Sequence, residues 1–349
     1  MEKVLIFPLN SDTGTLLSHG VSERYEVAAV SSYPEDKKEL EELQKQVSFY
    51  CSIDFEKCLS YVDSVVFAEE TMGSKKAGYR SKIEKALKAK KKIYLSEHVA
   101  KNFDIDFQNQ EISILQSSEI GNDLDLSYQE KINIPIISVV GMGENSDKFN
   151  LQVKVKTAIE KQGYKVLFVC SNVLGTFLGA ECIPGFVFSE KLSLPIKIGM
   201  FNHWLYNLQK EVHADVILLG CPGGILEFDE YESNYYGEAC LVMSNAVSVD
   251  IGILTIYRNL GLNTQTMEKL SSFCQEKYGL AVEDFVIAEQ IFKIDHEFRK
   301  IKYYHNSDAM FNAADLMKNG HVAMIENDEM VDKLVMTLLK KLENNIDAI

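Results

Sequence analysis

One stretch of the chain combines residue types whose spacing could bind phosphate. An apolar run, Ile136–Val140, leads into Gly141-Met-Gly-Glu-Asn-Ser-Asp-Lys148, and a helical pattern follows. Backbone N–H groups at the start of a helix, together with a lysine ammonium, form a cradle for an anion. The residues predicted to bind phosphate are Gly141, Gly143, Asn145, Ser146, Asp147 and Lys148.

Two positions of this loop differ from an ordinary nucleotidase. Asp147 stands where a glycine is expected, and Phe149 stands where a Ser or Thr hydroxyl would bind magnesium. A carboxylate beside the phosphates costs electrostatic energy unless a metal or Lys148 offsets it. Three interpretations stay open: a structural relic in which Lys148 neutralises Asp147 or extends to solvent, an anion site without hydrolysis, and an unusual nucleotide-dependent enzyme.

Three residues near the loop are candidates for catalysis. Glu144 is the candidate general base because it lies on an expected exposed turn, and a solvated carboxylate is the alternative. Cys221 follows an apolar run and precedes Pro-Gly-Gly, so its thiol is a candidate nucleophile, with a buried small residue as the alternative. Asp215 begins the same run and is the candidate replacement ligand for magnesium.

A second group of residues is expected to line a crevice. Open α/β sheets bind ligands beyond the carboxyl ends of their strands. Gly223, Gly224 and Glu227 follow such a strand, and His203 lies beside Trp204 in a helical pattern. A core or capping histidine is the alternative for His203. No metal site is expected from residue spacing, because paired short Cys or His spacings are missing.

Composition limits the classes of function. The chain has 349 residues, enough for two domains, and a formal net charge of −15. That charge repels nucleic acid and anionic lipid, so neither is expected as a partner. The seven cysteines are irregularly spaced, which favours reduced thiols in the cytoplasm. No run approaches the roughly 20 apolar residues of a membrane helix.

Strand and helix patterns alternate in both halves of the chain. The predicted strands cover 3–9, 25–31, 47–51, 62–68, 92–95, 136–140, 164–170, 214–220, 251–257, 285–287, 301–304 and 321–325. Helices are predicted near 35–46, 79–90, 148–162, 200–212, 235–246, 267–278, 309–317 and 328–342. This alternation predicts two Rossmann-like three-layer α/β domains with mainly parallel sheets, residues 1–125 and 126–349. The first lacks a G-x-G-x-x-G fingerprint at Asn10–Gly14.

The second half resembles the dethiobiotin synthetase class of P-loop NTPases. The loop from Gly141 to Lys148 is one residue longer than the usual G-x-x-x-x-G-K, as in that class. The strand at the second carboxylate site of that class ends in a Gly-Gly pair, and Asp215 to Gly224 is similar to it. The resemblance implies a P-loop NTPase-like second domain.

The chain as a whole resembles a clostridial peptide-maturation-system family. That family is encoded beside a radical SAM/SPASM maturase, a small ribosomal precursor peptide and an acyl-carrier-related protein. The segments that carry the resemblance are Ile136–Phe149, Asn202–His203, Asp215–Phe228, Gly237, Ser244–Val247, Asp54–Glu56 and Asp63–Phe67. The resemblance implies that Asp147 and Phe149 belong to the family's pattern, and it supplies a pathway without a reaction.

The expected function is therefore an accessory role in ribosomal peptide (bacteriocin-type) natural-product maturation, with a phosphate-bearing group bound at Gly141–Lys148. The alternatives are a nucleotide-dependent ligase or acyltransferase acting on a peptide or amino acid, and a non-catalytic adaptor. Candidate cofactors are ATP or GTP with Mg, or a phosphopantetheine group. Candidate partners are the precursor peptide, the acyl-carrier-related protein and the radical SAM maturase, and a homodimer stays open.

Overall fold

The chain forms two separate α/β units in the computed structural model, in which residues 1–69, 76–103, 105, 110–115, 126, 128–260, 262–305 and 321–346 are described. Unit 1 comprises Met1–Ser117 and Asn172–Gly185, and unit 2 comprises Ser118–Ser171 and Phe186–Ile349. The helix predicted at 309–317 and the domain boundary predicted at 125 lie outside the described residues.

Unit 1 is built on a parallel sheet with the strand order β3-β2-β1-β4-β5-β6. The strands are β1 (Glu2–Phe7), β2 (Tyr25–Ser31), β3 (Tyr50–Ser52), β4 (Ser64–Phe67), β5 (Lys92–Leu95) and β6 (Ile112–Ile114). The helices are α1 (Ser11–His19), η1 (Pro34–Asp36), α2 (Lys37–Gln44), α3 (Phe55–Leu59), α4 (Lys76–Lys88), α5 (Glu97–Asn102) and η3 (Val173–Leu178). This order is that of a doubly wound Rossmann-like sheet.

The turn from β1 to α1 is closed by a capping box. The Asn10 side chain accepts from the Thr13 amide at 3.0 Å, and the Thr13 hydroxyl accepts from the Asn10 amide at 2.7 Å. Two N–H groups at this helix start are thereby satisfied by protein side chains. Below the turn, Phe7 packs edge to face against Tyr33 and Phe55 in the apolar core of the unit.

Unit 2 contains a second sheet, in which the strands lie in the order β15-β12-β11-β7-β10-β8 and pair in parallel, with β7 between β11 and β10. Its strands are β7 (Ile136–Gly141), β8 (Val166–Cys170), β10 (Val216–Gly220), β11 (Ile251–Ile256), β12 (Val282–Ile287) and β15 (Val322–Met324). The two-residue strand β9 (Glu181–Cys182) belongs to the Asn172–Gly185 segment of unit 1. Every residue of β7, β10 and β11 is buried, as expected for strands covered by helices on both faces.

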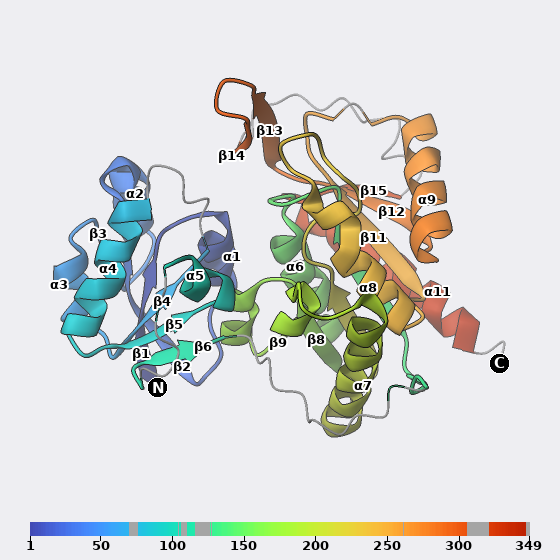
Figure 1. The fold of residues 1–349 in the computed structure, drawn as a ribbon, viewed down its shortest axis with the longest axis horizontal. Helices are drawn as coiled ribbons and strands as arrows, with labels where there is room; N and C mark the ends of the chain where they lie inside the picture. Colours follow the sequence, from blue (N-terminus) through green and yellow to red (C-terminus); the bar gives the residue numbers. More distant parts are fainter. Residues whose placement is uncertain are drawn as a thin grey trace. The chain divides into compact units, whose positions relative to one another are not determined.

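The helices of unit 2 form two groups. Helix α6 packs on α11, while α7 packs on α8 and α8 on α9 (Figure 1). The bounds are α6 (Lys148–Lys161), α7 (Leu194–Val212), α8 (Glu238–Ala246), α9 (Thr264–Tyr278) and α11 (Asp328–Ile346), with short turns η4 (Gly185–Phe188) and η5 (Asn234–Gly237). An antiparallel hairpin of β13 (Gln290–Asp295) and β14 (Lys300–His305) projects from one end of the unit (Figure 1).

The predicted fold class is confirmed: the chain has two Rossmann-like α/β units with mainly parallel sheets. Several details differ from the prediction, two of them in unit 2. Helix α7 begins at Leu194 instead of Met200, because Pro195 suits the first turn of a helix. Strand β13 was not predicted, and it pairs antiparallel with β14. Among the described residues, none of the helices has the length and hydropathy needed to span a bilayer.

Candidate functional site

The predicted phosphate loop connects the carboxyl end of β7 to the first residue of α6. Asn145 and Asp147 adopt positive φ angles of 51° and 58° there, which curls the backbone around the helix start. Within the described part of the chain, the backbone N–H groups of Gly143, Glu144, Asn145 and Ser146 donate to no protein acceptor. Unsatisfied N–H groups at a helix N-terminus are what an anion requires.

Lys148 begins α6 and is only 6% exposed. Its Nζ donates to the carbonyl oxygen of Gly143 at 2.6 Å and to that of Gly223 at 2.7 Å. The lysine therefore does not extend to solvent, so that form of the relic interpretation is wrong. Instead the ammonium joins the phosphate loop to the loop after β10, and its third N–H remains for another acceptor.

The Asp147 carboxylate does not lie beside the phosphate position, as the sequence suggested, but binds another part of unit 2. Its Oδ2 accepts from the backbone N–H of Glu289 at 2.7 Å and from that of Gln290 at 3.3 Å. The carboxylate therefore binds the turn that precedes β13, so the expected electrostatic conflict with a phosphate is relieved by hydrogen bonds to backbone amides. The backbone N–H of Asp147 can donate to a phosphate, while the Asp147 carboxylate holds the loop to the turn before β13.

Gly141 and Ser146 form the tightly packed floor of the loop. The Ser146 hydroxyl is fully buried, donates to the Gly143 carbonyl at 3.0 Å and lies 2.8 Å from the Thr255 hydroxyl. A Cβ on Gly141 would lie 2.4 Å from the Ser146 Oγ and 2.8 Å from the Thr255 Oγ1. Only glycine fits there, and the Ser146 hydroxyl supports the loop from beneath.

Phe149 and Asp215 decide how a magnesium ion could be held. Phe149 is buried, at 3% exposure, and supplies no hydroxyl. Asp215 is exposed and accepts from the Lys165 amide at 2.7 Å. Because β10 runs parallel to β7 and Asp215 precedes it, Asp215 lies at the sheet edge opposite the phosphate loop. Asp215 is therefore not a ligand at this loop, which corrects the prediction of a catalytic or magnesium-binding role.

The loop after β10 does approach the phosphate loop. A Cβ on Gly224 would lie 2.5 Å from the Asn234 Nδ2 and 2.6 Å from the Met142 carbonyl oxygen, and Gly223 binds Lys148 as described. Cys221, 3% exposed, instead donates its thiol to the Pro222 carbonyl oxygen at 3.5 Å, and its proximity together with burial raises the pKa of Cys240. The glycine pair thus meets the loop, while the thiol of Cys221 packs in the core.

The remaining predicted residues are dispersed. Glu144 is exposed in the loop, and its carbonyl oxygen accepts from the Tyr257 hydroxyl. Glu227 is exposed beyond the Gly-Gly pair. His203 is 8% exposed on α7, where its ring meets Tyr128 edge to face at 5.7 Å. That setting fits a packed core histidine.

The acidic residues of a turn beside the loop were missed by sequence reasoning. We name this turn, Asp229–Asn234, the acceptor turn. Glu232 accepts from the Tyr303 hydroxyl of β14 at 2.6 Å through Oε2. Asp229 accepts from the amides of Tyr231 and Glu232 at 2.8 and 3.0 Å through Oδ1. An acid-rich loop directly after the Gly-Gly pair was the available signal, but it is also the pattern of a solvated loop.

Electrostatics link the acceptor turn to the phosphate loop. Burial raises the pKa of the Glu232 carboxyl, and the nearby charges of Glu144 and Asp229 raise it further, against the Tyr303 hydrogen bond and the Lys148 charge. Burial also raises the pKa of Tyr303, whose ring stacks on that of Tyr257 at 5.9 Å. A partly buried carboxyl with a raised pKa beside a lysine is a common arrangement at functional sites.

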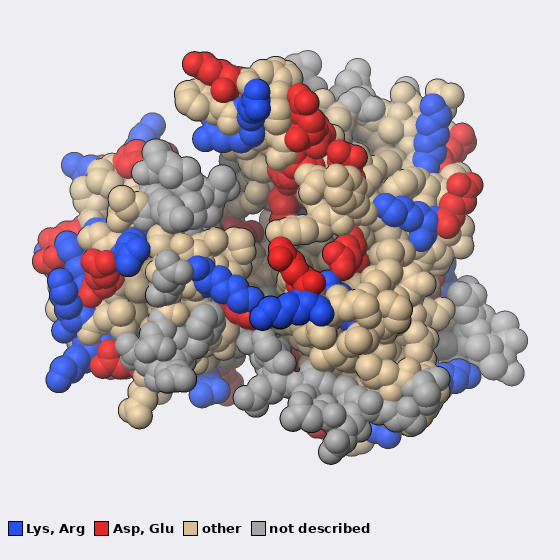
Figure 2. Space-filling view, viewed as in Figure 1, with Lys and Arg blue, Asp and Glu red and all other residues tan. Residues whose placement is uncertain are grey.

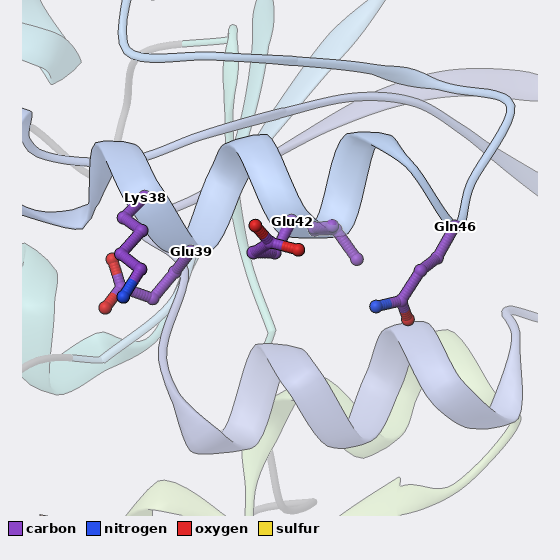
Figure 3. A pocket seen from close by; sticks show the side chains of 5 residues that line it. Lys38, Glu39, Glu42 and Gln46 are labelled. Atoms are coloured by element: carbon purple, nitrogen blue, oxygen red, sulfur yellow. The ribbon is translucent and has the colours of Figure 1, made fainter.

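Two other features lack the groups of a functional site. A hollow along α2 in unit 1 is lined by Lys38, Glu39, Glu42, Leu43 and Gln46, and the labelled side chains extend from one side of that helix (Figure 3). Its lining side chains offer no nucleophile and no enclosed polar group. Among the described residues, no group of three or more His, Cys, Asp or Glu side chains is arranged to hold a metal ion.

Comparisons with known proteins bear on the fold. No family model matches the chain, and no curated protein matches it. The chain is similar to the crystal structure of a DUF1611 family protein from Anabaena variabilis, with a TM-score of 0.56, 11% identity, and coverage of 82% of this chain and 88% of that chain. At this identity the similarity shows a shared fold across both units.

Two weaker similarities involve nucleotide complexes. One is the signal recognition particle 54 kDa protein from Aeropyrum pernix K1 with GDP, at TM-score 0.33, 15% identity, and coverage of 77% of this chain and 56% of that chain. The other is a nucleotide-binding protein from Archaeoglobus fulgidus with ADP, at TM-score 0.29, 12% identity, and coverage of 57% and 87%. Both are too distant to bear on the function of this chain.

Proposed function

We propose that the loop Gly141–Lys148 binds a phosphate-bearing group, and that the protein serves as an accessory protein of ribosomal peptide natural-product maturation. The observation that carries the binding proposal is the set of loop N–H groups, Gly143 to Ser146, that have no acceptor within the described ranges of the chain. A phosphate oxygen would accept from these groups at the positive end of the α6 dipole.

Lys148 complements this anion site. Its ammonium is already held within the loop by the Gly143 and Gly223 carbonyl oxygens. The charge is thus positioned before any ligand arrives, so little side-chain entropy is lost on binding. Phe149 supplies no hydroxyl for a magnesium ion, which favours binding without ordinary nucleotide hydrolysis.

A nucleotide-dependent ligase or acyltransferase is the second candidate. The specific observation that favours it is the partly buried carboxyl of Glu232. Burial raises the pKa of this carboxyl, while the charge of Lys148 lowers it. Such a carboxyl is better suited to general base catalysis near neutral pH than the exposed Glu144. A non-catalytic adaptor remains the third candidate, and the sequence resemblance supports the same pathway for all three.

The binding proposal is tested by thermal unfolding of the full chain with pyrophosphate, ATP, GTP or phosphopantetheine, each with and without magnesium. A ligand at a hundred times its Kd stabilises the folded state by about 2.7 kcal/mol. That corresponds to a rise in Tm of roughly 5–10 °C for a domain of this size. Magnesium-dependent turnover of ATP or GTP would favour the enzyme.

The variant Lys148→Ala should lose most of this stabilisation. Its matched control is Lys156→Ala, which removes a lysine of the same helix that pairs with Glu160 at the surface. Absence of stabilisation by every ligand would refute the binding proposal. Retention of the precursor peptide or acyl-carrier-related protein in a pull-down would support the pathway, and retention of neither would count against it.

A further inference from the structure

The acceptor turn carries oxygen atoms that receive no hydrogen bond from the described part of the chain. The Oδ2 of Asp229, the Oε1 of Glu232 and the Oδ1 of Asn234 are buried and have no partner among these residues. Each belongs to a side chain whose other polar atom is already engaged, by turn amides, by Tyr303 and by the Leu226 carbonyl oxygen respectively. Buried acceptors without donors are unfavourable, so a donor group bound at this turn would relieve that cost.

Asn234 is the residue of the acceptor turn that lies next to the phosphate loop. It is 7% exposed, and its Nδ2 lies 3.3 Å from the position of a Cβ on Gly143 and 2.5 Å from that of a Cβ on Gly224. Its carboxamide therefore lies against the loop that would hold a phosphate. In Figure 2, acidic side chains gather on unit 2 in a strip that extends from the β13–β14 hairpin.

The hydrogen-bonding character of the three buried oxygen atoms determines which kind of group they could bind. All are acceptors and two belong to carboxylates, so the group must be a hydrogen-bond donor and is favoured by positive charge. A primary ammonium offers three N–H donors. A metal ion fits less well, because only two of the three orphaned atoms belong to carboxylates, and no group of three His, Cys, Asp or Glu side chains in the described residues could hold one. The Lys148 ammonium is already held by two carbonyl oxygens.

We infer that Asp229, Glu232 and Asn234 of the acceptor turn bind the primary ammonium group of a substrate. The phosphate-bearing part of that substrate, or of its co-substrate, would lie in the adjacent loop Gly141–Lys148. Only this placement of the phosphate rests on the proposed function. The partly exposed ring of Tyr303, whose hydroxyl donates to Glu232, adds an aromatic face that favours an organic cation. An amino acid, a peptide N-terminus or a lysine side chain carries the required group.

The test is isothermal titration of the full chain with aminoalkyl phosphates of increasing chain length, each against the alkyl phosphate of equal length. At least one aminoalkyl phosphate should bind about tenfold more tightly than its partner, the equivalent of 1.4 kcal/mol. Glu232→Gln should abolish that preference and leave alkyl phosphate binding intact. Glu230→Gln, which removes an exposed carboxylate of the same turn, should preserve the preference.

The outcomes separate this inference from the proposed function. Equal binding of both series, with pyrophosphate still bound, overturns the ammonium site and leaves the phosphate site standing. If no phosphate binds, simple alkylamines are titrated alone: binding that Glu232→Gln removes supports the ammonium site, and no binding overturns it. Glu232-dependent binding of magnesium in place of the amine also overturns it. Should Glu232→Gln fail to fold, the wild-type difference between the two series decides.

Discussion

In each unit, a strand is followed by a tight turn and a helix at the carboxyl edge of a parallel sheet. The two turns differ in whether their backbone N–H groups have hydrogen-bond acceptors. At the β1–α1 turn, Asn10 and Thr13 satisfy each other's backbone amides. At the β7–α6 turn, the amides from Gly143 to Ser146 have no acceptor among the described residues. Topology alone therefore does not make an anion site, because the turn must also leave its donors unsatisfied.

The substitution with the largest expected effect is Phe149→Ser, which restores the hydroxyl of an ordinary P-loop. Because Phe149 is buried, the variant should lose about 3–5 kcal/mol of unfolding free energy. Urea denaturation measures this loss. If the variant kept wild-type stability and gained magnesium-dependent hydrolysis, the loop would be a damaged nucleotidase and not a repurposed one.

Gly141→Ala sharpens the comparison at the floor of the loop. The added Cβ would overlap the Ser146 hydroxyl, so we expect a loss of about 1–3 kcal/mol and weaker phosphate binding. Gly14→Ala is the matched change in α1, where nothing lies within 4 Å of the added Cβ. It should raise stability by about 0.5–1 kcal/mol. Equal effects of the two changes on thermal unfolding would contradict the packing described for the loop.

Asp147→Asn tests whether this carboxylate fixes the loop or faces the ligand. The amide keeps the left-handed backbone but gives weaker hydrogen bonds to the Glu289 and Gln290 amides, which should cost about 1.5 kcal/mol. Pyrophosphate affinity, measured by titration, should change less than threefold. A tenfold or greater gain in affinity would mean that the carboxylate repels the bound anion directly.

The smallest effect is expected from Asn10→Ala in unit 1. Loss of this helix cap should cost about 1 kcal/mol. Because the turn offers no phosphate site, pyrophosphate affinity should stay at the wild-type value. A drop in that affinity would show that the two turns are not functionally separate.

The sequence predicted what is encoded locally. Buried parallel strands are continuous apolar runs, so β2 (Tyr25–Ser31) and β5 (Lys92–Leu95) were predicted at their observed bounds. The loop from Gly141 to Lys148 was recognisable because a strand, glycines, a lysine and a helix follow in order. The direction of the Asp147 side chain was not, because its acceptor role depends on amides far along the chain, at Glu289 and Gln290.

Dependence on contacts between distant parts of the chain also explains the wrong predictions at the site. Asp215 was assigned to the loop from the Gly-Gly resemblance, but its position before a strand parallel to β7 puts it at the other edge. The acceptor turn was missed because an acidic loop usually points to solvent. Its burial depends on Tyr303 of the β13–β14 hairpin, which no local pattern around Glu232 reveals.

The most direct test of the central claim is amide hydrogen exchange on the full chain with and without pyrophosphate. The amides of Gly143 to Ser146 should exchange at least about tenfold more slowly with ligand, since each tenfold corresponds to 1.4 kcal/mol of added protection. The amides of Asn10 and Thr13, already bonded within their turn, should exchange at unchanged rates. Unchanged exchange from Gly143 to Ser146 at saturating pyrophosphate would contradict the account.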